Sequence, residues 1–187
     1  MKKKTFLPVL AMCLGVAILC LATRAAAERE PRVGINIGNV SFAAPVTAEG
    51  AAYLGLRGQT PFTLSDIKAP YVVVESMYIH CAHSRAQAPI LNELYRLVAG
   101  DPRLRNQIKF VAAHQGLGQD AAERWKKSMN VPFAVVPDRG SRLSAAMNFY
   151  PYPVTMLVDK GGTVLWVRVG EFHDAYGALQ GIKKAIR

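Results

Sequence analysis

The chain has 187 residues, a length that suits a single domain. Hydrophobic residues make up 51% and charged residues 19% of it, which excludes an intrinsically disordered protein. The net charge is +10, but the basic residues are scattered and form neither an arginine-rich stripe nor a stacking platform, so we expect no nucleic-acid partner.

Residues 1–27 have the pattern of a secretory signal peptide. Three lysines follow the first methionine, residues 5–22 are apolar, and small residues precede a predicted cleavage after Ala27. The alternative is an uncleaved membrane anchor, because the apolar run is nearly long enough to span a bilayer. Both interpretations predict an exported, periplasmic or extracytoplasmic protein, and the second adds a tether to the inner membrane through the N-terminus.

Removal of this segment leaves Cys81 as the only cysteine. Cys13 and Cys20 depart with residues 1–27, and the net charge falls to +6, with 19 basic against 13 acidic residues. The mature chain therefore cannot form an internal disulfide. A single cysteine in an oxidising compartment, where cysteines are usually paired, calls for an explanation.

The next part of the chain predicts an extension before the main domain. Residues 28–51 are assigned to this N-terminal strand and turn extension, and residues 52–187 to one domain. Val33, Ile35 and Ile37 alternate at the period of a β-strand, and residues 60–67 indicate a short strand and a turn.

From residue 69 onward strands and helices alternate. A β-branched run at 71–77 predicts a buried strand, and a helix follows to Gly100, with Pro89 inside it as a kink. Its predicted buried face consists of Ile90, Leu91, Leu94, Leu97 and Val98.

The second half continues this alternation. We expect a strand at 108–114, a helix at 118–130, a short strand at 131–138, a short helix at 140–149, a hairpin of strands at 153–159 and 163–170, and a helix at 171–187. The inward residues are Ala122, Trp125 and Met129 in the first of these helices, and Phe172, Tyr176, Leu179, Ile182 and Ile186 in the last. Crossover helices require parallel pairing and a hairpin requires antiparallel pairing, which predicts an α/β fold with a mixed central sheet and helices on both faces.

Four marks in this order carry a family resemblance. Cys81 opens a helix after the first core strand, and Pro89 lies eight residues on. Pro153 stands between Tyr152 and a strand, and that strand leads into a glycine hairpin. Over residues 52–187 the chain thus resembles the thioredoxin fold, in its exported TlpA/ResA-type branch that is grouped with redoxin and AhpC/TSA proteins.

Three residues depart from that family pattern. Ser84 stands where the second cysteine of a CxxC pair is expected, which makes a CxxS site. His80 stands where the family often has tryptophan, and Gln87 where this branch commonly has glutamate. These departures argue against dithiol cycling, although they leave the fold prediction intact.

Cys81 is the predicted nucleophile. Its reactive form is the thiolate, which a helix N-terminus favours through unpaired N–H groups and partial positive charge. The His83 imidazole and the Ser84 hydroxyl are expected to favour it further, and the Cys-x-His spacing resembles the CPHC site of oxidising DsbA proteins. The alternative is that Cys81 is an inert, small apolar residue.

The resemblance implies roles for residues outside the CxxS segment. Glu75 matches the buried acid of thioredoxin, a general base that relays protons; the alternative is a strand-end carboxylate paired with a basic side chain. Pro153 matches the cis-proline beside the cysteine, and together with Tyr152 and His80 it is predicted to contact an extended substrate peptide. The alternative is an ordinary trans-proline.

These residues predict a monothiol thiol–disulfide oxidoreductase. Serine cannot release a mixed disulfide, so a small thiol or a redox partner protein must do so, and the partners are this external thiol and a protein disulfide or thiol substrate. A non-catalytic binding module is one alternative. A one-cysteine peroxidase is another, but Tyr78 stands where peroxiredoxins place threonine or serine.

Metals and cofactors are not expected. His80, Cys81 and His83 are soft ligands, but a strand end and a helix do not bring them readily onto one ion. His114 and His173 are predicted to be ordinary surface or loop residues.

Overall fold

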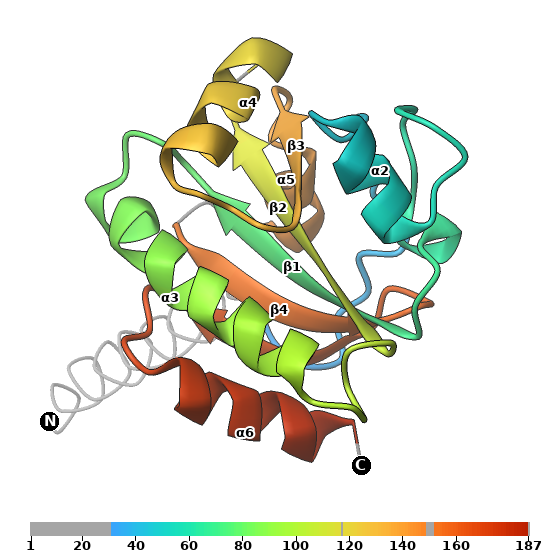
Figure 1. Cartoon of the computed structure of the whole chain (residues 1–187), viewed down its shortest axis with the longest axis vertical. Helices are drawn as coiled ribbons and strands as arrows, with labels where there is room; N and C mark the ends of the chain where they lie inside the picture. Colours follow the sequence, from blue (N-terminus) through green and yellow to red (C-terminus); the bar gives the residue numbers. More distant parts are fainter. Residues whose placement is uncertain (1–30, 117, 149–151, 187) are drawn as a thin grey trace, which may run out of the picture. The chain divides into compact units, whose positions relative to one another are not determined.

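A five-stranded mixed sheet organises the chain (Figure 1). The structure is a computed structural model that describes residues 31–116, 118–148 and 152–186. The predicted signal segment lies outside these residues. No helix among the described residues is long and apolar enough to cross a membrane.

The predicted strands are confirmed, with small shifts at their ends. They are β1 (Tyr71–Met77), β2 (Ile108–Gln115), β3 (Ala134–Asp138), β4 (Val154–Asp159) and β5 (Val164–Val169). Their order across the sheet is β3-β2-β1-β4-β5. β1 pairs in parallel with β2, and β2 with β3, whereas the hairpin of β4 and β5 runs antiparallel to β1.

The predicted helices are confirmed as well. They are α3 (Ala82–Gly100), α4 (Gln119–Ser128), α5 (Arg142–Met147) and α6 (Ala175–Ala185), and Pro89 lies inside α3. One inward assignment in α6 is wrong, because Tyr176 follows the Asp174 cap in the first turn and is 63% exposed. Leu179 and Ile182 form the buried face of that helix.

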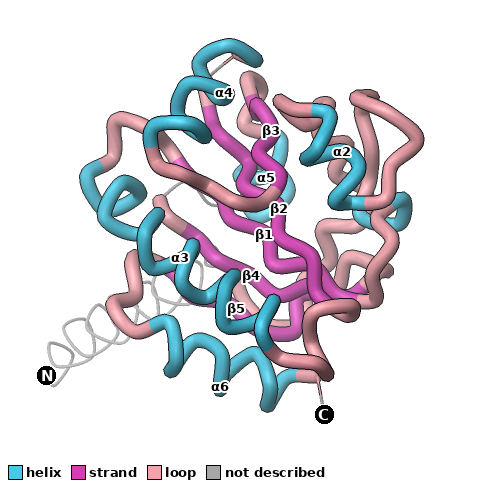
Figure 2. The backbone as a smooth tube through the Cα atoms, viewed as in Figure 1, coloured by secondary structure: helices cyan, strands magenta, loops and turns pink. Residues whose placement is uncertain are grey.

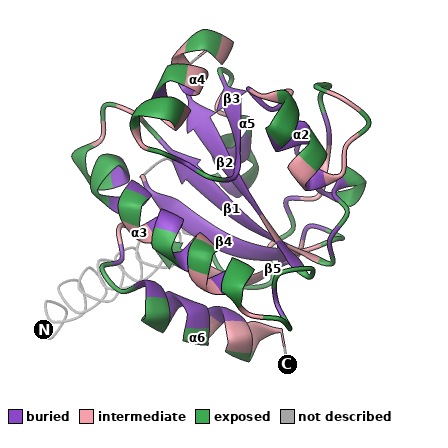
Figure 3. Cartoon of the chain, in the orientation of Figure 1, coloured by how far each residue is buried: buried purple, intermediate pink, exposed green. Residues whose placement is uncertain are grey.

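The two faces of the sheet carry separate apolar layers, as strand alternation requires. Val73, Phe110 and Leu157 point toward α3, α4 and α6, whereas Val74 and Met156 point to the opposite face. α5 and the N-terminal segment cover that opposite face. Figure 2 shows the strands between these layers, and Figure 3 shows that β1, β2, β3 and β4 are almost entirely buried.

The N-terminal segment differs from its prediction. The strand expected at 33–37 is wrong, because turns interrupt it and a single bridge pairs Asn36 with Thr163. A further helix, α2 (Ala48–Leu54), packs beside β3 and was not predicted from the sequence. Thr47 caps its start by accepting a hydrogen bond from the Gly50 N–H at 3.1 Å, and Gly55 ends it with a φ of 75°. A short 3₁₀ turn, η1 (Leu64–Asp66), follows.

Candidate functional site

Cys81 lies at the junction of β1 and α3. It is the N-cap residue of a 19-residue helix, and its carbonyl oxygen accepts the first helical hydrogen bond from Arg85 at 3.1 Å. A turn closed by a hydrogen bond from Cys81 N–H to the Tyr78 carbonyl oxygen, 3.0 Å, connects it to the strand. Cys81 is partly exposed, so this loop presents a free thiol at the positive end of a helix dipole.

The segment before β4 meets this thiol. Cys81 Sγ donates to the Tyr152 carbonyl oxygen at 3.6 Å, and the Tyr152–Pro153 peptide bond is cis. Pro153 is buried, and its own carbonyl oxygen accepts a hydrogen bond from Gly170 N–H at 2.9 Å. The structure therefore brings Cys81 together with Tyr152, which lies 71 residues later in the chain, and with the adjacent Pro153.

His83 lies in the first turn of α3 but is paired with an acid. Its Nδ1 is 3.2 Å from Glu171 Oε2, and the other oxygen of Glu171 is 3.5 Å from His173 Nε2. Both imidazoles are largely exposed, at 68% and 80%. Among the described residues no hydrogen bond joins His83 to Cys81, so its predicted influence on the thiol acts through space at most.

Ser84 occupies the place of the missing second thiol. It is 1% exposed, and its Oγ accepts a hydrogen bond from the Tyr78 backbone N–H at 3.3 Å. The hydroxyl thus stabilises the turn that carries Cys81. No hydrogen bond between Ser84 and Cys81 is found in the described part of the chain.

Aromatic side chains border the thiol. The rings of Tyr78 and His80 meet edge to face with centroids 5.3 Å apart, and the rings of Tyr78 and Tyr152 are 6.0 Å apart. Tyr78 and His80 are exposed. The Tyr152 hydroxyl donates to Gln115 Oε1 at 2.6 Å, which anchors this border to β2.

Glu75 is fully buried on β1 and faces α3. Its Oε2 accepts a hydrogen bond from the Thr155 hydroxyl at 2.5 Å, and its Oε1 has no hydrogen-bond partner in the described part of the chain. Burial raises the pKa of this carboxyl from 4.5 to about 8, and the Thr155 hydrogen bond opposes part of that rise. No basic side chain pairs with Glu75 among the described residues, so the alternative interpretation as an ion pair has no support in this part of the chain.

His114 corrects a prediction, because it is buried and not on the surface. It is a β2 residue opposite Met77, and its ring meets Trp125 of α4 edge to face at 5.1 Å. Within the described ranges neither ring nitrogen has a hydrogen-bond partner, and burial lowers the pKa of the imidazole to about 4. His173 is exposed in a loop, as predicted.

Two residues of the site were not predicted. Thr155 reaches Glu75 because the two are paired across the antiparallel β1 and β4, a register that the sequence pattern does not specify. Glu171 contacts His83 only because the loop after β5 folds back onto the start of α3. Within residues 31–116, 118–148 and 152–186 no group of three histidine, cysteine, aspartate or glutamate side chains has an arrangement that could hold a metal ion.

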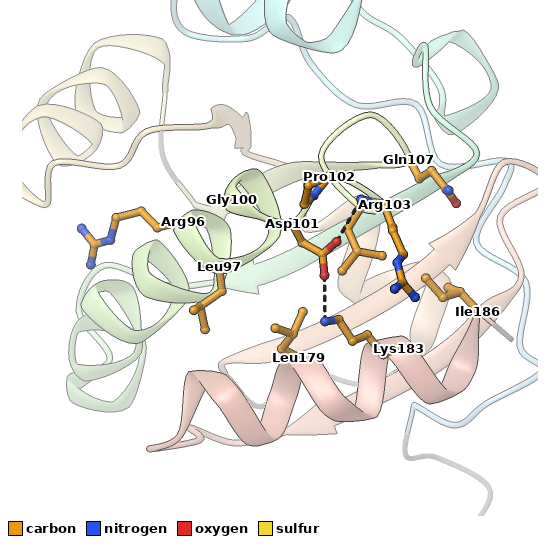
Figure 4. Close-up of a pocket in the computed structure, with 11 residues that line it drawn as sticks. Arg96, Leu97, Gly100, Asp101, Pro102, Arg103, Gln107, Leu179, Lys183 and Ile186 are labelled. Carbon is orange, nitrogen blue, oxygen red and sulfur yellow. Dashed lines mark hydrogen bonds and ion pairs between the residues drawn. The ribbon is translucent and has the colours of Figure 1, made fainter.

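A hollow of about 910 Å³ lies away from the thiol, between the end of α3 and α6 (Figure 4). Asp101 and Lys183 form an ion pair of 2.8 Å across it, and Asp101 also accepts a hydrogen bond from Arg103 N–H at 2.9 Å. Both interactions lower the pKa of the Asp101 carboxyl, and the hydrogen bond from Lys183 has the larger effect. The hollow includes none of the predicted site residues.

Comparison with known proteins places this geometry in context. No protein-family model matches the chain. The chain is 26% identical over 122 residues to the thiol-disulfide oxidoreductase ResA of Geobacillus kaustophilus, an alignment that covers 64% of this chain and 67% of that protein. It is 25% identical over 109 residues to ResA of Bacillus cereus, covering 58% and 60% of the two chains, so that alignment spans less than two thirds of the relative.

Solved structures agree on the fold. A protein from Chlorobium tepidum, assigned as the thiol:disulfide interchange protein DsbE, superposes with a TM-score of 0.64 and 17% identity over 83% of this chain and 99% of that one. A DsbF homologue from Corynebacterium diphtheriae gives 0.58 and 19% over 81% and 91%. These likenesses confirm the thioredoxin fold, and with the sequence relatives they confirm the resemblance to the TlpA/ResA-type branch.

Proposed function

We propose that this chain is an exported monothiol thiol–disulfide oxidoreductase that acts through Cys81. The observation that carries the proposal is the position of the sulfur, partly exposed at the N-cap of α3 and 3.6 Å from the carbonyl oxygen that precedes cis-Pro153. Its similarity to ResA proteins, which are named for thiol–disulfide oxidoreductase activity, supports the same reaction class.

The reaction has two exchange steps. The Cys81 thiolate attacks one sulfur of a substrate disulfide, a new S–S bond forms, and the other substrate sulfur leaves as a thiolate that takes up a proton. Ser84 has no sulfur with which to attack the mixed disulfide. An external thiolate therefore attacks it, forms a disulfide with the substrate sulfur and releases Cys81 as a thiolate.

Buried and bordering residues supply the remaining roles. Glu75 holds or accepts the proton that the thiol exchanges, because burial raises the pKa of its carboxyl to about 8. Tyr152, Pro153 and His80 border the sulfur where an extended peptide would approach, and His83 adds a cation beside it when protonated. Export rests on residues 1–27, as a cleaved signal or as an anchor that tethers the domain to the membrane.

Trapping of the mixed disulfide tests this function. The purified chain without residues 1–27 is incubated with a disulfide-bonded peptide and quenched with acid, and adducts are counted by mass spectrometry. We expect one adduct at Cys81 that persists until glutathione or another small thiol is added. Cys81→Ser should form none. An unmodified wild-type chain, with Cys81 also unreactive to iodoacetamide near neutral pH, would sink the proposal.

A binding module is the second candidate, and the burial of Ser84 favours it. This hydroxyl supports the Tyr78 turn and contributes no thiol, so the fold is maintained whether or not Cys81 reacts. Expression of wild type and Cys81→Ala in a strain that lacks the gene separates the two functions. Equal rescue by both would favour binding, whereas loss of rescue by Cys81→Ala favours exchange.

A further inference from the structure

A chain of three buried hydrogen bonds links Glu75 to the loop after β5. The Phe172 backbone N–H donates to Gln87 Oε1 at 2.9 Å, Gln87 Nε2 donates to Thr155 Oγ1 at 3.4 Å, and Thr155 donates to Glu75 Oε2 at 2.5 Å. Gln87, Thr155 and Glu75 are each 0% exposed. They come from α3, β4 and β1, so three elements meet at this carboxyl.

The direction of every bond in this chain follows from its first member. A backbone N–H can only donate, so the Gln87 carbonyl oxygen must face Phe172 and the amide nitrogen must face Thr155. Thr155 therefore meets a donor on the Gln87 side. Its single hydroxyl proton is left with Glu75 Oε2 as its acceptor.

Counting the donors and acceptors around Glu75 also locates the proton of its neutral carboxyl. A proton on Oε2 would displace the Thr155 hydroxyl proton from its acceptor and would also leave Oε1 without a donor. Two buried polar groups would then lack a hydrogen-bond partner. A proton on Oε1 keeps the hydrogen bond from Thr155 and leaves only one buried polar group, the Oε1 hydroxyl itself, without a partner. Oε1 is also the oxygen that has no partner among the described residues.

We propose that Gln87 is a positioning residue that confines the exchangeable proton of Glu75 to Oε1, by presenting a donor and no acceptor to Thr155. The inference rests on the proposed function, in which Glu75 exchanges a proton with the thiol chemistry at Cys81. It also gives a role to Gln87, which replaces the glutamate common in the branch that the chain resembles. A glutamate there would offer Thr155 an acceptor and reverse its bond.

Burial raises the pKa of this carboxyl, and the Thr155 hydrogen bond opposes part of that rise. Among the described residues no basic side chain forms an ion pair with it. The direction of the Thr155 bond is therefore the main local feature that a substitution can change.

Infrared difference spectroscopy of the full mature chain tests the proposal. The C=O stretch of protonated Glu75 is recorded across pH 6 to 10, and its band is identified by its loss in Glu75→Gln of the same background. In the wild type the carbonyl oxygen is Oε2, which accepts from Thr155, so the band lies at low frequency and disappears with a midpoint near pH 8.

Two substitutions at position 87 form a matched pair. Gln87→Leu removes both hydrogen bonds and offers Thr155 neither donor nor acceptor, so the band should keep its frequency. Gln87→Glu offers an acceptor, so the proton should move to Oε2, the band should shift to higher frequency, and its midpoint pH should rise. Thr155→Val should also shift the band upward, and Thr155→Ser should restore it.

The results separate this inference from the proposed function. An unshifted band in Gln87→Glu, or an equal shift in Gln87→Leu, would overturn the positioning role, because a merely structural role predicts the larger effect in Gln87→Leu. If the bands behave as expected but the wild type forms no mixed disulfide, the proton position is correct and the monothiol function is not. If mixed disulfide forms and its pH profile moves upward in Gln87→Glu alone, both stand.

Discussion

His83 Nδ1 lies 3.2 Å from Glu171 Oε2, so the loop after β5 holds the imidazole that follows Cys81 by two residues. The carboxylate of Glu171 is only 22% exposed and faces two histidines. The negative charge of Glu171 offsets the positive charge of these imidazoles when they are protonated.

Removal of that negative charge should make Cys81 more reactive. We expect Glu171→Gln to speed alkylation of Cys81 at pH 6.5 by about twofold to fivefold, because a nearby anion disfavours a thiolate and a freed imidazolium favours it. The measurement is the rate of iodoacetamide labelling. His173→Gln is the control, since it leaves the pair of His83 and Glu171 in place; a rate in Glu171→Gln equal to that of the control would contradict the prediction.

Ser84→Cys should restore a resolving thiol. The side chain replaces one buried oxygen with sulfur three residues after Cys81, so the lifetime of a mixed disulfide should fall by about tenfold or more, because an intramolecular thiol acts at high effective concentration. Quenched-flow mass spectrometry with a peptide disulfide measures this lifetime. Ser84→Ala, which loses the bond to Tyr78 without gaining a thiol, should leave the lifetime unchanged. A persistent adduct in Ser84→Cys would be the opposite of what we expect.

Glu75 should make the protein less stable as pH rises. The folded carboxyl keeps its proton to about pH 8, whereas the unfolded one loses it near 4.5, so the folded state binds more protons between these values. The free energy of unfolding should fall by about 2 kcal/mol between pH 6.5 and 8, at 1.4 kcal/mol per unit. Urea denaturation of wild type and Glu75→Gln checks it, and the variant should be nearly flat over this range.

His114 should act in the opposite direction at lower pH. Its folded pKa is lowered to about 4 from 6.5, so below pH 6.5 the unfolded state binds more protons and stability falls as pH falls. Glu75 masks this effect, so the test uses the Glu75→Gln background. There we expect a loss of about 2 kcal/mol between pH 6.5 and 5, which His114→Phe should abolish. An equal loss in the double variant would refute the assignment.

Gly162 should tolerate no side chain. A Cβ there would lie 2.2 Å from the backbone of Gly38, and the residue has a φ of +86°. Gly162→Ala should therefore cost about 3 kcal/mol, the sum of a left-handed conformation and overpacking. Gly34→Ala is the matched control, with a φ of +92° and open space around it, and should cost only about 1 kcal/mol. Thermal unfolding compares them, and equal costs would show that the contact with Gly38 contributes nothing.

The sequence predicted what local patterns determine. Val72, Val73 and Val74 form a β-branched run that predicts a buried strand, and the spacing of Leu91, Leu94 and Val98 predicts a helix. The position of Cys81 between them followed directly. The N-terminal segment was harder, because Val33 is exposed while Ile37 is buried, and the alternation reflects turns along the end of β5.

Contacts between distant segments could not be predicted. The partner of Glu75 depends on the register of β4, and the partner of His83 depends on how a loop returns to α3. The burial of His114 was missed because histidine is polar and the strand was expected to end at it, whereas β2 continues to Gln115 and Trp125 covers the ring.

Glu75 and His114 lie on the same face of the sheet, beneath α3 and α4. A shift of pH in either direction therefore introduces charge into one apolar layer and leaves the other uncharged by these two groups. Local unfolding in acid or alkali should begin in the layer that contains Glu75 and His114. Amide protons of α3 and α4 should then exchange with solvent before those of α5. We therefore expect the side of the sheet that carries the thiol to open at extreme pH before the opposite side does.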